Sequence, residues 1–153
     1  MKSARHPRYM PQWWKLRRRT AQEAAQALML DPAFRMWLIA VGRAYQGGHA
    51  NFEAEELRTL VPKMNRSTGE TSLYSDRQIG RLIKDLIEAG ILAPASNRRC
   101  LVIPFTLLNA DIQYSPVPCP EHGHDLSWTP DGWIDPVALV DGLGVAATMR
   151  KAG

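Results

Sequence analysis

The sequence contains few cysteines and no long hydrophobic run. Its 153 residues include two cysteines, Cys100 and Cys119, which are too few for the disulfide framework of a small secreted domain. No stretch approaches the roughly 18 uncharged apolar residues of a membrane span. The apolar run of a secretory signal is missing as well, because three arginines stand in its place, at Arg17, Arg18 and Arg19. These absences predict a cytoplasmic protein with no membrane partner.

Motifs of the common enzyme classes are also missing. The sequence has no glycine-rich phosphate-binding loop, no nucleophile elbow and no His-Glu-x-x-His zinc motif. With 153 residues, of which 45% are hydrophobic, the chain can form one core but not a large multidomain enzyme. We therefore predict that the protein is not an enzyme.

Charge is abundant but unevenly distributed along the chain. The net charge is only +4, yet residues 1–19 contain seven basic side chains and no acidic one. A second basic block, residues 58–99, contains eight basic and four acidic side chains. Two basic blocks favour a polyanionic partner such as nucleic acid or an anionic membrane surface. Prolines in the first block disfavour the amphipathic helix that a membrane-surface role needs, so nucleic acid is the predicted partner.

Capping signals and apolar periodicity predict three helices in the first part of the chain. A Thr-x-x-Glu capping box begins at Thr20, and an alanine-rich run with high helix propensity follows it. Asp31, followed by Pro32, is expected to cap a second helix, whose apolar residues recur at helical spacing up to a Gly-Gly pair. A shorter helix is predicted over 51–61, with a polar connector over 62–74 after it.

The most regular predicted helix spans residues 75–89. A second capping box, from Ser75 to Gln78, opens it. At 100° per residue its isoleucines and leucines share one face. Three basic residues occupy the opposite face, Arg77, Arg81 and Lys84. A helix whose solvent-exposed face happens to be basic is the ordinary interpretation of this pattern. Beyond the helix, two β-prone runs flank residues 94–99 and predict a hairpin.

The run from Ser75 to Leu92 reads Ser-Asp-Arg-Gln-Ile-Gly-Arg-Leu-Ile-Lys-Asp-Leu-Ile-Glu-Ala-Gly-Ile-Leu. It resembles a segment of bacterial winged helix-turn-helix domains, Ser-x-x-(Thr/Gln)-(Val/Ile)-x-Arg-x-(Ile/Leu)-x-x-Leu-x-x-x-Gly-(Ile/Leu)-(Ile/Leu), and the resemblance covers residues 33–105. It implies a mainly α fold with a small β-hairpin, in which the helix enters the DNA major groove and the hairpin forms a wing at 94–100. The pattern occurs in transcription regulators, in plasmid and phage replication proteins and in some winged helices that bind only protein.

The resemblance implies a set of side chains that face DNA. They are Ser75, Arg77, Gln78, Arg81 and Lys84 on the helix and Asn97, Arg98 and Arg99 on the wing. Arginine prefers guanine and glutamine prefers adenine, so Arg77, Gln78 and Arg81 are expected to read base edges. Arg98 and Arg99 are expected to reach the adjacent backbone or minor groove.

One feature departs from the family pattern. Thirteen residues separate Val61 from Ser75, whereas a tight helix-turn-helix has three or four residues in its turn. Either the preceding helix runs beyond Pro62 or the connector is an insertion. Lys63 and Arg66 in this connector are expected to add phosphate contacts.

The predicted organisation has three parts. They are a basic arm with a short helix (1–31), the winged-helix domain (32–108) and an acidic extension rich in proline and tryptophan (109–153). Three arginines of the arm offer sequence-independent phosphate contacts, Arg17, Arg18 and Arg19. The tryptophan pair at 13–14 is suited to staple the arm, to stack on bases or to contact another subunit. A homodimer through the helix at 20–30 or through the extension is also open.

A short segment of the extension is the candidate for metal chemistry. It contains a cysteine and two histidines, Cys119, His122 and His124, which are residue types that ligate zinc. Cys100 would complete a set of four if its strand lies close. The spacing differs from that of common zinc fingers. An ordinary loop with exposed histidines, a structural zinc site and a catalytic zinc site with Glu121 as base are all open.

These observations lead to one main hypothesis and two alternatives. We expect a sequence-specific double-stranded DNA-binding protein of bacterial, plasmid or phage origin, associated with the nucleoid, that regulates transcription or assists replication. The first alternative is a winged-helix module that binds a protein partner through Trp128 and Trp133 of the extension. The second is a zinc-dependent nucleic-acid enzyme.

Overall fold

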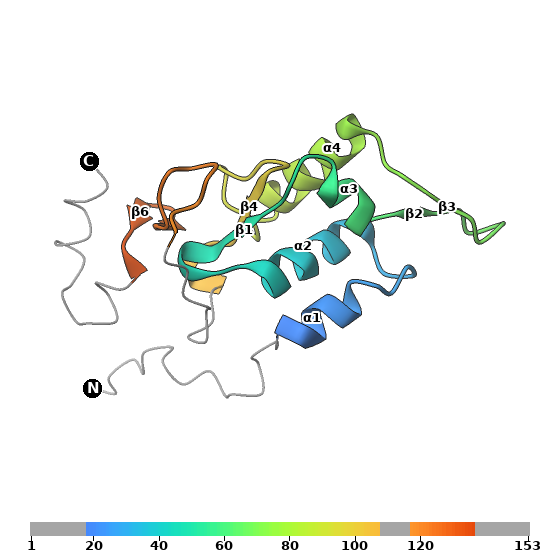
Figure 1. Ribbon diagram of the computed structural model, residues 1–153, viewed down its shortest axis with the longest axis horizontal. Coiled ribbons are helices and arrows are strands. Elements are labelled where there is room, and N and C mark those ends of the chain that lie inside the picture. The colour runs from blue at the N-terminus through green and yellow to red at the C-terminus, as the bar shows by residue number, and fades with distance from the viewer. Residues whose placement is uncertain (1–17, 108–116, 137–153) are drawn as a thin grey trace, which may run out of the picture.

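The computed structural model describes residues 18–107 and 117–136 (Figure 1). Arg17, the tryptophan pair of the predicted arm and the last part of the predicted extension lie outside these ranges. The described residues form short helices and small antiparallel sheets of two strands each. The fold is therefore mixed α/β with small antiparallel sheets, and it contains more β structure than the mainly α fold with one hairpin that the resemblance implies.

Two of the helices begin at the predicted caps. The α-helices are α1 (Arg18–Ala24), α2 (Pro32–Arg43), α3 (Glu56–Leu60) and α4 (Asp76–Glu88), and the 3-10 turns are η3 (Gln46–Gly48) and η4 (Phe105–Leu107). The Asp31 carboxylate accepts the backbone N–H groups of Ala33 and Phe34 at the start of α2. Ser75 and Gln78 form the reciprocal capping box of α4. Both caps are confirmed.

The predicted helix over 51–61 is wrong in its first half. Residues His49–Asn51 form strand β1, which pairs antiparallel with β4 (Cys100–Val102). Glu55 then adopts a left-handed conformation with φ of 64°, and the helix α3 begins only after it. The strand forms because its backbone groups find partners about fifty residues away in the sequence, and this long-range pairing overrides local helix propensity.

The predicted hairpin around 94–99 forms only in part. Strand β4 has β1 as its main partner, while the segment before the turn contributes a single ladder bond from Ala93 N–H to the Val102 carbonyl at 2.8 Å. The turn itself is tight, with Asn97 bridging back to Cys100. The wing predicted at 94–100 is therefore a short turn fastened to the β1–β4 pair.

The connector over 62–74 contains a hairpin rather than a continuation of the preceding helix. Strands β2 (Lys63–Met64) and β3 (Thr71–Ser72) pair as a separate hairpin between α3 and α4. Figure 1 shows this hairpin extending away from the body of the fold. Lys63 and Arg66 are exposed on it. The short turn of a tight helix-turn-helix, which the resemblance implies, is therefore not present between α3 and α4.

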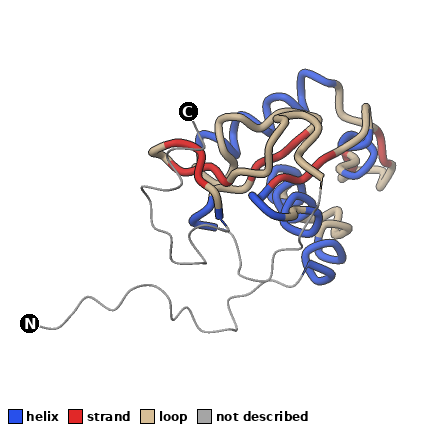
Figure 2. The backbone as a smooth tube through the Cα atoms, turned by 60° about the vertical axis from the view of Figure 1, so that its left-hand side comes forward, coloured by secondary structure: helices blue, strands red, loops and turns tan. Residues whose placement is uncertain are grey.

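One hydrophobic cluster joins α1, α2 and α4. Ile79, Ile83 and Leu86 of α4 are buried with Met36 of α2 and Leu101 of β4. Figure 1 shows β1 and β4 between α4 and α2, and Figure 2 shows short strands flanked by helices from a second direction. Burial of each such side chain contributes about 1.5–3 kcal/mol. The packing fixes which face of α4 remains exposed to solvent.

A buried arginine joins the ends of two helices to this core. Arg35 of α2 is only 2% exposed. Its Nε donates to the Ala25 carbonyl at 2.7 Å, and its Nη1 donates to the Pro62 carbonyl at 3.0 Å. Burial lowers the pKa of the Arg35 guanidinium from its usual value. The two carbonyls satisfy donors that burial would otherwise leave without partners.

The described part of the extension packs against β4. Strands β5 (Ser127–Thr129) and β6 (Gly132–Ile134) form a hairpin with Trp128 opposite Trp133. Both tryptophans pack, partly buried, on a second cluster of four residues, Ala93, Cys100, Val102 and Cys119. The protein-interaction alternative expects the turn to display both tryptophans to a partner. In the structure they pack, partly buried, against the rest of the fold.

Gly47 lies in close contact with the extension, at the backbone of Asp125. Its φ is +81°, and a Cβ at this position would lie 2.1 Å from the Asp125 carbonyl oxygen. A Gly47→Ala variant should therefore combine backbone strain with a steric clash against main chain that cannot move cheaply. Gly69 is the matched control, because it has a φ of +73° and open space around it.

We expect Gly69→Ala to lower the free energy of unfolding by about 1–2 kcal/mol, the cost of the left-handed backbone alone. Gly47→Ala should cost about 3 kcal/mol or more. Denaturant unfolding of both variants measures the difference. Equal costs would show that the extension does not approach Gly47.

Candidate metal centre and candidate nucleic-acid interface

Four side chains from three separate segments converge in the second cluster. They are His49 of β1, Cys100 of β4, and Cys119 and His122 of the loop that precedes β5. Their potential ligand atoms all lie within 4.8 Å of one another, and all but the half-buried His122 are buried. The group could hold a metal ion.

Three distances between these atoms are close to the edges of a tetrahedral site. The Cys100 and Cys119 sulfurs are 3.6 Å apart, the Cys100 sulfur lies 3.6 Å from His49 Nδ1, and the Cys119 sulfur lies 3.4 Å from His122 Nδ1. With zinc–sulfur bonds of about 2.3 Å and zinc–nitrogen bonds of about 2.0–2.1 Å, a tetrahedral ion separates two sulfurs by about 3.8 Å and a sulfur from a nitrogen by about 3.6 Å. A disulfide needs a sulfur–sulfur distance of about 2.05 Å, and both cysteines are free.

Backbone carbonyls orient both histidine rings. His49 Nε2 lies 2.8 Å from the Leu126 carbonyl oxygen, and His122 Nε2 lies 3.0 Å from the Ala95 carbonyl oxygen. A carbonyl only accepts hydrogen bonds, so each Nε2 carries the ring proton and donates it. Each Nδ1 is then left with a free lone pair directed at the cysteines. Metal-ligating histidines are supported in this way by the hydrogen bond of the second nitrogen.

The protonation states of the buried ligands depend on this environment. Burial lowers the pKa of His49 to about 4, which keeps its imidazole neutral near pH 7. Burial, and next the neighbouring Cys119, raise the pKa of the Cys100 thiol. If both cysteines are ionised, the two adjacent buried thiolates need a compensating positive charge. A bound divalent ion would provide this charge, and the two thiol protons would be released to solvent.

A tight turn brings the two ligands of the extension together. The Gly123 N–H donates to the Cys119 carbonyl at 2.7 Å, and the Cys119 N–H donates to the His124 carbonyl at 3.2 Å. Gly123 permits this turn with a φ of 71°. The turn places Cys119 and His122 on the same side, facing β1 and β4.

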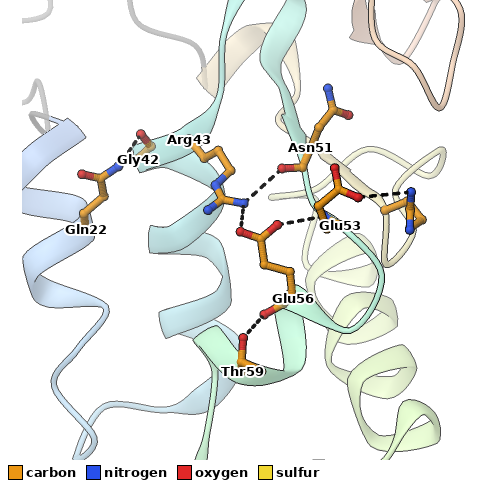
Figure 3. A network of polar contacts seen from close by, with 8 residues as sticks. Gln22, Gly42, Arg43, Asn51, Glu53, Glu56 and Thr59 are labelled. Carbon is orange, nitrogen blue, oxygen red and sulfur yellow. Dashed lines mark hydrogen bonds and ion pairs between the residues drawn. The ribbon is translucent and has the colours of Figure 1, made fainter.

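The polar network in Figure 3 fixes the strand that carries His49. Arg43 Nη1 donates to the Asn51 carbonyl at 3.2 Å and pairs with the Glu56 carboxylate at 2.6 Å. Glu56 also accepts the Glu53 N–H at 2.8 Å, and the Arg43 guanidinium lies 4.8 Å from the centre of the Phe52 ring. These contacts join α2, β1 and α3 beside the metal cluster.

The structure brings together three residues that the sequence associates with zinc and adds a fourth. Cys119 and His122 lie in the cluster with Cys100, as predicted. His124 does not, because its Nδ1 accepts the Leu126 N–H at 3.2 Å and its ring packs edge-on against Trp133. His49 takes the fourth position. It has no motif around it in the sequence, and only the β1–β4 pairing reveals it.

The exposed face of α4 carries two arginines without partners. Arg77 and Arg81 are exposed, and neither has a hydrogen-bond or ion-pair partner within the part of the chain that the structure describes. Lys84, one turn on, pairs with Glu88 at 3.7 Å. Ile79 and Ile83 are buried on the opposite side. On the face predicted to meet DNA, Arg77 and Arg81 are therefore exposed and unpaired with respect to residues 18–107 and 117–136.

Other predicted contact residues have structural partners. Gln78 Oε1 accepts the Ser75 N–H at 2.9 Å, while the Ser75 hydroxyl accepts the Gln78 N–H at 3.3 Å. Both side chains thus cap α4, and Gln78 keeps only its amide N–H₂ for another partner. Arg19 pairs with Glu23 within α1, which also contains Arg18.

The wing lies beside the N-terminus of α4. Arg98 Nη1 pairs with an Asp76 carboxylate oxygen at 2.7 Å, and this ion pair lowers the pKa of Asp76. Arg99 lies 4.0 Å from the Glu53 carboxylate. Asn97 accepts the N–H groups of Arg99 and Cys100 through its side-chain oxygen and donates to Glu121 at 3.2 Å. The wing and the helix therefore form one continuous surface.

No family model, curated protein or solved structure matches this chain. Among the described residues, none of the helices has both the length and the apolar character to cross a bilayer.

Proposed function

We propose that the protein binds double-stranded DNA as a winged helix-turn-helix protein, with α4 in the major groove. The observation that carries the proposal is a pair of exposed arginines, Arg77 and Arg81, on the N-terminal half of a capped helix, neither of which has a partner among the described residues. Its support is the position of Arg98 at the same end of α4. This arrangement places guanidinium groups where a recognition helix meets base edges and phosphates. It suits either a transcription regulator or a replication accessory protein.

Each part of the surface has a distinct role in this proposal. Arg77 and Arg81 form bidentate hydrogen bonds to guanine edges. Arg98 exchanges its Asp76 partner for a phosphate oxygen, and the projecting hairpin adds Lys63 and Arg66 as sequence-independent phosphate contacts. The basic residues before α1 add further electrostatic attraction.

Selection of duplexes from a random pool tests this proposal. We expect one enriched consensus, bound at least about a thousandfold more tightly than unrelated duplex at physiological salt. A palindromic consensus would indicate a dimer. Failure to enrich any duplex, even at low salt, would overturn the proposal, and co-purification of a protein would then favour the protein-interaction alternative.

Asp76 should restrain DNA binding, because it places a carboxylate on the proposed surface and occupies Arg98. An Asp76→Asn variant should therefore bind duplex about threefold to tenfold more tightly and show a salt slope steeper by about one unit, the effect of one additional phosphate contact. Asp131→Asn, in the exposed β5–β6 turn, changes the net charge equally and should have little effect. Equal gains in the two variants would mean that only the net charge matters and that Asp76 does not lie at the interface.

We also propose that the metal cluster holds zinc in a structural role. The observation that favours zinc is the set of two cysteines and two histidines, in which three distances between ligand atoms are close to tetrahedral edges. Four protein ligands leave no position for a reactive water on a tetrahedral ion, so the site serves the fold rather than catalysis. Metal analysis of the purified chain should find one zinc per chain, and absence of stoichiometric metal would overturn this proposal.

A further inference from the structure

The wing and the metal loop are fastened to each other at successive positions. Ala95, at the start of the wing turn, accepts the hydrogen bond of His122 at 3.0 Å. Asn97, at its middle, donates to Glu121 at 3.2 Å. Cys100, directly after the two wing arginines, is itself one of the four potential ligands. The turn that carries Arg98 and Arg99 is thus held along its length by groups of the metal site.

Other contacts hold the base of this turn and its two arginines. Its base is held by the Ala93 bond to Val102 and by the Ser96 hydroxyl, which accepts the Val102 N–H at 2.9 Å. Beyond this base, the Phe52 N–H donates to the Arg99 carbonyl at 2.9 Å and Arg98 pairs with Asp76 at 2.7 Å. At Ala95 and Asn97, the hydrogen bonds from outside the turn come from His122 and Glu121 of the metal loop, among the residues that the structure describes. Both lie on a loop that reaches β4 through Cys119. Without an ion, the Cys119 end of this loop has sulfur contacts to Asn51 at 3.2 Å and to Cys100 at 3.6 Å in place of metal–ligand bonds.

We infer that metal occupancy of the His49, Cys100, Cys119 and His122 site positions the wing and thereby strengthens DNA binding. This inference rests on both proposed functions. The ion fixes the loop, the loop fixes the turn through Ala95 and Asn97, and the turn presents Arg98 beside α4. Linkage makes the effect reciprocal, so DNA must tighten metal binding by the same factor by which the metal tightens DNA binding.

The test compares the full chain loaded with zinc and the same chain after chelation, on the selected duplex at fixed salt. We expect the zinc-loaded protein to bind about 5- to 150-fold more tightly, the usual range of such couplings. Competition of the loaded protein with a zinc chelator, with and without duplex, should give the same factor. This second measurement does not require the metal-free protein to remain folded.

Variants test which contacts couple zinc binding to DNA binding. Arg98→Ala combined with Arg99→Ala should reduce the coupling factor towards one, because the turn then lacks the two arginines whose DNA contacts depend on its position. Glu121→Ala should reduce it as well, whereas Glu121→Gln, which removes the same charge but keeps the acceptor for Asn97, should not.

The outcomes separate this inference from its two premises. Loaded protein that binds no duplex contradicts the DNA-binding proposal, and protein that takes up no zinc contradicts the zinc proposal. If the protein takes up zinc and binds duplex, and its affinity for duplex is the same before and after chelation, the inference alone is overturned. A coupling factor that is unchanged in the Arg98 and Arg99 double variant overturns it too.

Discussion

A His122→Gln variant should lose stoichiometric zinc and unfold at markedly lower denaturant concentration. His122 supplies one of four ligands, and its Nδ1 lone pair is directed at the site by the Ala95 carbonyl. If its loss weakens zinc binding a thousandfold, the free energy of unfolding at saturating zinc falls by about 4 kcal/mol. Metal content and denaturant unfolding at fixed free zinc measure the two effects.

His124→Gln is the matched control. It changes the same residue type two positions further along the chain, in a ring that contacts Trp133 and accepts the Leu126 N–H. We expect it to retain zinc and to cost about 1 kcal/mol. If His124→Gln loses zinc while His122→Gln keeps it, the ligand set proposed for the structure is wrong.

Replacing Arg77 and Arg81 together by alanine should reduce specific duplex affinity by about 2–6 kcal/mol. Each bidentate base contact contributes roughly 1–3 kcal/mol of discrimination, so the loss corresponds to a factor between about 30 and about 2 × 10⁴. The melting temperature should remain unchanged, because both side chains are exposed and have no partner in the part of the chain that the structure describes.

The double lysine variant of the same two positions separates two roles of these arginines. Lysine keeps the charge but not the planar pair of donors. We expect it to retain affinity for unrelated duplex and to lose preference for the selected sequence. A folded double alanine variant that binds the selected duplex as tightly as the parent would show that α4 does not read DNA.

Local features of the fold could be predicted from the sequence, whereas long-range ones could not. The caps at Asp31 and Ser75 depend on neighbours within three residues, and α4 follows from its own periodicity. Strand β1 depends on Cys100–Val102 about fifty residues later, so a helix start at residue 51 was the better local interpretation. The connector between α3 and α4 contains polar residues whose pairing as a hairpin has no strong sequence signal.

The candidate metal site shows the same division. Cys119 and His122 lie three residues apart, so the sequence alone brings them together. His49 enters the site only because β1 pairs with β4, and His124 leaves it because the turn at Gly123 directs its ring towards Trp133. The Arg98 ion pair with Asp76 likewise joins positions that no local pattern associates.

Chemical-shift mapping of the isotope-labelled, zinc-loaded protein tests the central claim most directly. On titration with the selected duplex, we predict that the largest shifts lie in the first half of α4, from Ser75 to Lys84, and at Asn97 to Arg99 of the wing. Smaller shifts are expected at Lys63 and Arg66. Shifts centred on α1 and the start of α2, with α4 and the wing unaffected, would contradict the proposed mode of DNA binding.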